Sequence, residues 1–350
     1  MTGSGPNLGR AVDWQFAGTV GARLARPGPP TTDYTRKQAI DDLAGAARAA
    51  EAPVREVTQL SDGAPVDEAR IVDREQWIRS ASDSMRVMTG GDVTPSGRVA
   101  PRITGAQTGA VLAFISSGIL GQYDPFAAGH ADGQGALLLV YPNVIAVERQ
   151  LRLTPKDFRL WVCLHEVTHR VQFTANPWLA GHMSSALAAL TAERDDDVVA
   201  MLGGIADFVR NRRSPGATSE PGGIVGLLRA VQSESQRAAL DQLLVLGTLL
   251  EGHADYVMDA VGPAVVPSVQ LIRSRFDERR HRKQPPLQRL LRALLGVDAK
   301  LSQYTRGRAF VDHVVDRVGM ARFNAVWSGP ETLPLHAEIE NPQRWIDRVL

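Results

Sequence analysis

One predicted helix, over residues 154–173, constrains this chain more than any other segment. Thr154 suits the N-cap position, and Pro155 suits the first helical position because the proline has no N–H to leave unpaired. The helix would carry His165 and His169, four residues apart. Four residues turn a helix by about 400°, so the two imidazoles project from one face, one turn apart. This spacing predicts that both side chains bind a single metal ion.

The residue after the first histidine completes an H-E-x-x-H pattern. Glu166 lies about 100° around the helix from His165, so it points to the side of the metal rather than at it. A carboxylate so placed can take a proton from a water that a zinc ion polarises. We therefore predict Zn²⁺ as the cofactor, His165 and His169 as ligands, and Glu166 as a catalytic general base.

The cysteine content limits the alternatives. The chain has one cysteine and eight histidines in 350 residues, which excludes a disulfide framework and any metal site built from several thiolates. Cys163 lies two residues before His165, so it would face away from the metal, and we expect a small buried core residue there. The remaining ligands must come from histidines and carboxylates.

A catalytic zinc needs a third protein ligand, and Glu251 is the leading candidate. It lies in a leucine-rich helix predicted over 234–261, where a buried carboxylate needs a positively charged partner. Asp255, one turn further along the same face, could accept the free ring N–H of a ligand histidine and fix its orientation. His253 lies about 200° around the helix from Glu251 and should point elsewhere.

Two alternatives for the third ligand stay open. Glu193 and Asp197 show the same four-residue spacing and lie closer to His169 in sequence, although their segment is densely charged and resembles a solvated surface. Asp255 could also bind the metal directly.

A hydrolytic site also needs a donor for the negative charge that develops on the substrate oxygen. Tyr304, in a polar stretch between helical segments, is the preferred candidate. Four other side chains could serve instead: Arg306, His313, His253 and His182.

The whole chain predicts a mainly helical protein with a small β element. Helices are expected over 11–25, 34–52 (closed by Pro53), 70–88, 109–120, 144–151, 154–173, 186–210, 224–230, 234–261, 266–280, 287–295, 303–318, 319–327 and 343–350. Loops are expected over 89–101, 211–223 and 330–342. The first of these loops suggests an N-terminal tail and helical region over 1–100, followed by a catalytic domain over 101–350, unless the two form one continuous domain.

The clearest strand covers residues 136–141, between Gly135 and Pro142. If it forms the edge of a sheet beside the metal, it could bind an extended peptide by strand addition. An entirely structural strand is the alternative.

Charge and hydropathy exclude other classes of function. Lys and Arg number 39 and Asp and Glu 38, so the formal net charge of +1 is too small to attract nucleic acid. The longest apolar stretch, 109–120, is shorter than the ~20 residues of a membrane span. The first thirty residues lack the apolar core of a signal peptide, so we expect a cytoplasmic protein with neither nucleic-acid nor membrane partners.

Two segments carry a resemblance to a known family. WVCLHEVTHRVQF at 161–173 and LLEGHADYVMD at 249–259 resemble the type 2 zincin-like metallopeptidase family, a group of hydrolases of which some are associated with deazaflavin coenzyme biosynthesis. Further matches extend the resemblance over most of the chain from about residue 100: LGQYD at 120–124, VVPSVQLIRSRFDERR at 265–280, LLGVDAKLSQY at 294–304 and FNAVWSGPETLP at 323–334.

The resemblance implies a zincin-like architecture with the H-E-x-x-H pattern on a central helix. It implies His165 and His169 as zinc ligands and Glu166 as the base. Glu251 and Asp255 are similar to the pairing of third ligand and histidine partner in glutamate zincins, although their distance from the first motif is longer than usual.

The leading hypothesis is a zinc-dependent hydrolase, a metallopeptidase, that acts on a peptide or small amide substrate. One alternative is a non-catalytic, zinc-stabilised scaffold or binding protein. The other is a hydrolase of a non-peptide amide linked to cofactor metabolism. The oligomeric state and the substrate are not encoded in any motif of the sequence.

Overall fold

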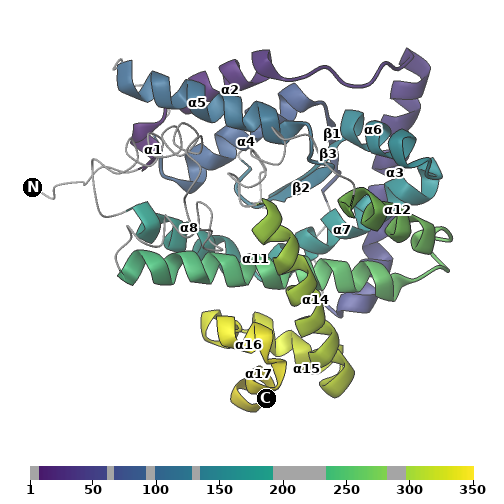
Figure 1. The fold of residues 1–350 in the computed structure, drawn as a ribbon, viewed down its shortest axis with the longest axis vertical. Coiled ribbons are helices and arrows are strands. Elements are labelled where there is room, and N and C mark those ends of the chain that lie inside the picture. Colours follow the sequence, from purple (N-terminus) through teal and green to yellow (C-terminus); the bar gives the residue numbers. More distant parts are fainter. Residues whose placement is uncertain (1–7, 61–66, 92–98, 128–134, 192–233, 282–296) are drawn as a thin grey trace, which may run out of the picture.

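The computed structural model describes residues 8–60, 67–91, 99–127, 135–191, 234–281 and 297–350. Helices dominate this part of the chain, and a small three-stranded sheet lies among them, as the sequence predicts (Figure 1). Within the described residues, no helix is both long and apolar enough to cross a membrane.

The elements follow one another along the chain with the strands confined to its first half. They are α1 (Leu8–Ala11), α2 (Trp14–Leu24), α3 (Asp33–Thr58), β1 (Arg70–Val72), α4 (Arg74–Met88), α5 (Val99–Ser116), β2 (Gly121–Asp124), β3 (Ala136–Val140), α6 (Tyr141–Leu151), α7 (Pro155–Ala175), α8 (Trp178–Thr191), α11 (Glu234–Val261), α12 (Val269–His281), α14 (Val297–Val318), α15 (Met320–Phe323), η1 (Asn324–Trp327), η2 (Pro330–Thr332), α16 (His336–Glu340) and α17 (Pro342–Val349).

The sheet has the order β1-β3-β2, with β1 parallel and β2 antiparallel to β3. All five residues of β3 are buried, which explains its unbroken apolar sequence. Because β3 pairs on both sides, strand addition to this segment, which its sequence allowed, is ruled out. The edge strand nearest the predicted zinc helix is β2, which contacts α7.

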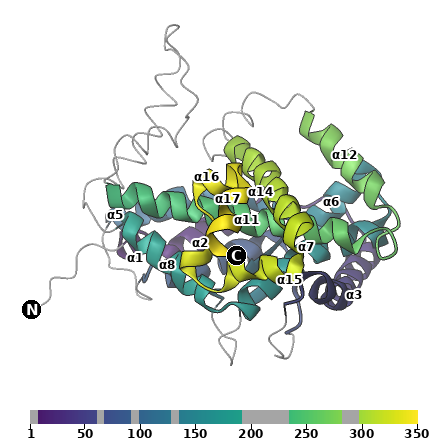
Figure 2. The same ribbon diagram turned by 90° about the horizontal axis from the view of Figure 1, so that it is seen from below.

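Helix α7 lies between the sheet and α11, and α3 packs along it (Figure 1). Its apolar side chains join the main core, where Phe158, Val162, Leu164, Val167 and Val171 are at most 2% exposed. Thr154 is the N-cap of α7 as predicted, but its side chain makes no capping hydrogen bond. The C-terminal helices α14 and α16 cover the other side of α11 (Figure 2).

Two buried arginines, which the sequence analysis did not single out, fix α7 against its neighbours. The Arg159 guanidinium donates to Glu148 at 2.8 and 3.0 Å and to Asp42 at 2.6 Å. Arg170 pairs with Glu51 and donates to the Asp67 carbonyl at 2.8 Å. Burial makes each arginine dependent on its partners, so these ion pairs restrict how α7 sits against α3 and α6.

Tertiary packing accounts for most differences from the predicted elements. Helix α3 continues past Pro53 to Thr58, although an interior proline costs about 3 kcal/mol. Ala50 and Val54 around the proline are fully buried, so continued burial against α7 offsets that cost. Residues 70–72, predicted as helical, form β1 because they pair with β3.

Other boundaries also move. Helix α5 begins at Val99 and ends at Ser116, and the predicted loop at 330–342 contains η2 and α16. Helix α8 begins at Trp178, earlier than predicted, while the expected elements at 192–230 and 287–295 lie outside the described residues. The predicted helix over 234–261 is confirmed with the same bounds.

Helices α11 and α14 approach closely because glycines face each other. A Cβ on Gly252 would overlap the carbonyl carbon of Gly307, and a Cβ on Gly307 would overlap the carbonyl of Thr248. Gly247, also in α11, has open space around the position of a Cβ. Within α11, Gly252 therefore permits the close approach of α14, whereas Gly247 does not contribute to it.

We expect Gly252→Ala to lower the free energy of unfolding by about 1–3 kcal/mol, because α14 must move away from α11. Gly247→Ala is the matched control and should raise it by about 0.5–1 kcal/mol, since alanine favours the helix. Urea denaturation of both variants measures the difference. Equal effects of the two substitutions would contradict the close approach.

Candidate metal centre

The two histidines of α7 project toward α11, which delivers the third residue of the site. The Nε2 atoms of His165 and His169 are 3.2 Å apart, and their rings are nearly perpendicular, at 88°. From α11, Glu251 Oε2 lies 3.3 Å from His165 Nε2 and 3.8 Å from His169 Nε2. Among the described residues, these three form the group whose donor atoms could hold one metal ion.

The environment of Glu251 provides a test of whether this group fits a metal. Its Oε2 atom is buried and has no hydrogen-bond partner among the described residues, although two ring nitrogens face it. A buried carboxylate oxygen without a donor is costly unless a cation lies beside it. Two imidazole nitrogens and one carboxylate are a usual ligand set for catalytic zinc. The three residues therefore fit zinc.

Electrostatics at the centre favour a positive charge. Burial opposes protonation of His165, but the facing carboxylate of Glu251, with further charge from Glu166 and Asp255, raises the pKa of His165 to about 9. Burial acts against ionised Glu251 too, yet contacts with both histidines hold the pKa of Glu251 well below its usual range. The carboxylates around these histidines thus stabilise positive charge at the centre.

Glu166 lies beside this group and against the sheet. Its side chain is 7% exposed, and a Cβ on Gly121 of β2 would lie 2.6 Å from Glu166 Cγ and 3.0 Å from its Oε1. A glycine at this point of β2 lets the glutamate side chain lie directly on the strand backbone. Nothing local in the sequence shows which helix the strand at Gly121 meets.

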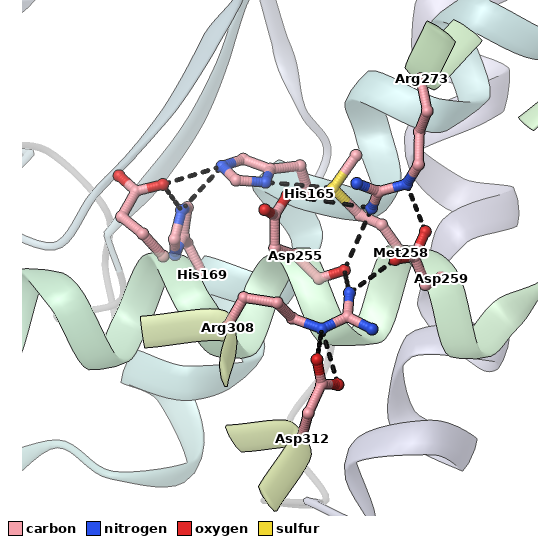
Figure 3. A network of polar contacts seen from close by, with 9 residues as sticks. His165, His169, Asp255, Met258, Asp259, Arg273, Arg308 and Asp312 are labelled. Atoms are coloured by element: carbon pink, nitrogen blue, oxygen red, sulfur yellow. Dashed lines mark hydrogen bonds and ion pairs between the residues drawn. The ribbon is translucent and has the colours of Figure 1, made fainter. Parts of the chain in front are cut away.

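Asp255 occupies a different place from the one expected. His165 Nδ1 lies 3.2 Å from Met258 Sδ, and His169 Nδ1 lies 2.9 Å from Gln172 Oε1 (Figure 3). The Asp255 carboxylate lies 3.9 Å from Arg273 Nη2. The expected hydrogen bond from a ligand histidine to Asp255 is thus not among the contacts of the described residues, because other side chains occupy both Nδ1 positions. Asp255 acts on His165 through its charge.

An ionic network holds this end of α11 against α12 and α14 (Figure 3). Arg308 of α14 donates to Asp312 at 2.7 Å, to Asp259 at 2.6 Å and to the Asp255 carbonyl at 2.7 Å. Arg273 of α12 pairs with Asp259 as well. No short-range sequence pattern links Arg273 or Arg308 to Asp259.

A second polar contact that the sequence did not predict, between Gln172 and His253, lies behind His169. Gln172 and His253 are fully buried, and Gln172 Nε2 is 2.9 Å from His253 Nδ1. His253 points away from the three candidate ligands, as its position on the helix predicts, and packs against Phe323 and Trp327. Burial, with a smaller contribution from the charge of His169, lowers the pKa of His253 to about 3.

The remaining candidates are placed elsewhere or not described. Glu193 and Asp197 lie outside the described residues, and so does the side chain of Tyr304 in α14. His182 packs on Trp178, with ring centroids 5.7 Å apart. Cys163 is fully buried, and its Sγ lies 3.8 Å from the Leu43 carbonyl, so the prediction of a core residue is confirmed.

Comparisons with known proteins identify the family of the chain. A model of the zincin-like metallopeptidase family matches residues 12–346, and the chain therefore belongs to this family. A crystal structure from Chloroflexus aurantiacus, described as a candidate hydrolase with a novel fold, is 28% identical; the alignment covers 96% of this chain and 98% of that one, with a TM-score of 0.67. No curated protein matches.

The buried His253 gives a prediction for stability at acid pH. Its pKa is about 3 in the folded protein and about 6.5 when unfolded, so the unfolded chain binds one more proton between these values. Stability then falls with decreasing pH, by up to about 1.4 kcal/mol per unit for this group. We expect metal-free His253→Phe to show a shallower slope from pH 6.5 to 4 in denaturant titrations. Parallel curves for both proteins would contradict a neutral buried His253.

Proposed function

We propose that this protein is a zinc-dependent hydrolase and that it cleaves peptide bonds. The observation that carries the proposal is the convergence of His165, His169 and Glu251 on one point, with Glu166 beside them. The described residues supply three candidate protein ligands, the number that a catalytic zinc site uses while it keeps one position for water or substrate. This match supports a hydrolase rather than a zinc-stabilised scaffold.

In this proposal the two histidines and Glu251 hold the ion. Zinc bound there would act as a Lewis acid toward the attacking water and the substrate carbonyl. Glu166 accepts the proton of the attacking water and delivers it to the leaving nitrogen. Its contact with β2 restricts the carboxylate to one side of the site.

The position of β2 supports a peptide as substrate. This strand pairs with β3 along one edge only, in the described sheet, and its first residue, Gly121, lies at Glu166. An extended peptide that paired with the other edge of β2 would therefore pass the base. We assign the strand-addition role to β2 in place of the central strand β3.

Replacing the base tests the mechanism. We expect Glu166→Gln to bind zinc as the unmodified protein does and to reduce peptide hydrolysis by at least about 100-fold, because the amide cannot accept the proton. Zinc content by elemental analysis and cleavage of a peptide library measure the two properties. Retained turnover would contradict the role of Glu166.

Replacing the third ligand tests the site itself. We expect Glu251→Ala to lose zinc, since two histidines alone hold it weakly, whereas Glu193→Ala should bind one equivalent. Dialysis against limiting zinc followed by elemental analysis gives both stoichiometries. Loss of zinc only in the Glu193 variant would assign the ligand to the rival segment.

A further inference from the structure

A buried glutamine joins the two helices that form the metal centre. Gln172 lies on α7 one turn after His169 and is fully buried. Its Oε1 lies 2.9 Å from His169 Nδ1, while its Nε2 lies 3.0 Å from the Leu250 carbonyl and 2.9 Å from His253 Nδ1. The carbonyl belongs to the residue that precedes Glu251 on α11.

The identity of each donor follows from these three contacts. A carbonyl only accepts, so the amide nitrogen of Gln172 must face Leu250. The amide oxygen then faces His169, whose Nδ1 must carry a proton to donate to it. The second amide hydrogen needs an acceptor, which an unprotonated His253 Nδ1 provides. In its neutral form, the one that binds a metal, His169 is then left with an unprotonated Nε2, the atom that faces Glu251.

We propose that Gln172 is a positioning residue that holds His169 with its Nε2 lone pair aimed at the metal and fixes α7 against α11 beside Glu251. This inference rests on the proposed zinc site and extends it. Hydrogen bonds to the outer nitrogen of a ligand histidine fix its tautomer and orientation, and their loss typically costs about 10- to 100-fold in metal affinity.

In the part of the chain that the structure describes, no side-chain amide contacts the other ligand histidine, His165. His165 Nδ1 faces the sulfur of Met258, a weak acceptor. Of the two ligand histidines, His169 is therefore the one whose orientation is fixed by a strong hydrogen bond. His253 supports it from behind, because it accepts from Gln172 while its ring packs on Phe323 and Trp327.

Two substitutions at Gln172 separate positioning from packing. Gln172→Leu fills the space without an acceptor for His169, and Gln172→Glu keeps an acceptor but buries a charge. Positioning predicts that the leucine variant binds zinc about 10- to 100-fold more weakly and that the glutamate variant binds more tightly than the leucine variant. A packing role predicts the reverse order, because a buried charge destabilises the helix contact more than an apolar side chain does.

Asn176→Ala is the matched control. Its buried amide lies on the same helix and donates to the Gln172 backbone carbonyl at 2.9 Å, without a contact to either ligand histidine. We expect its zinc affinity to match that of the unmodified protein. His253→Phe keeps an aromatic ring but removes the acceptor, and should weaken zinc binding less than Gln172→Leu.

The experiment measures zinc dissociation constants by competition with a chromophoric chelator. Histidine-selective ¹⁵N NMR of the metal-free proteins reports which ring nitrogen of His169 carries the proton; we expect Nδ1 in the unmodified protein and a larger share of the Nε2-protonated tautomer in Gln172→Leu. If that variant does not fold, Gln172→Glu and His253→Phe are compared with Asn176→Ala.

Equal affinities for the Gln172 variants and the control, or tighter binding by leucine than by glutamate, would overturn the inference while leaving the zinc site intact. Failure of the unmodified protein to bind zinc would instead contradict the proposed function, and the inference with it.

Discussion

A carboxylate that is buried away from water needs a positive charge near it. In this protein the buried carboxylate lies on α11, and the groups that can supply the charge lie on α7. Glu251 Oε2 is buried, has no hydrogen-bond donor in the described part of the chain, and faces the Nε2 atoms of His165 and His169. The approach of these two helices determines the site. The glycine contact between α11 and α14, the ion pairs of Arg308 and the amide of Gln172 all set the place of α11 relative to its neighbours.

The parts of the site that could be predicted from the sequence are those that depend on local geometry or on composition. The four-residue spacing of the histidines places them on one face of any helix. Glu251 could be found because it is a carboxylate in a run of leucines, a context in which an ion must have a partner. The mainly helical class and the strand at 136–141 likewise followed from apolar runs and turn residues.

What the sequence could not show depends on long-range packing. Asp255 has the spacing of a histidine partner, yet Met258 and Gln172 occupy the two ring nitrogens, and only the packing of the folded helices decides which side chain reaches them. Strand β3 looked available for a peptide because nothing local shows that β1 and β2 cover both its edges. Pro53 predicted a helix end because proline is unfavourable inside a helix. The burial of Ala50 and Val54, which offsets this cost, arises only when the helices pack.

The most direct test of this metal centre is X-ray absorption at the zinc edge of the protein loaded with one equivalent of zinc. We expect nitrogen and oxygen neighbours at about 2.0–2.2 Å, with the multiple-scattering signal of two imidazoles. A sulfur atom at about 2.3 Å, or a shell without imidazole scattering, would contradict a centre built from His165, His169 and Glu251.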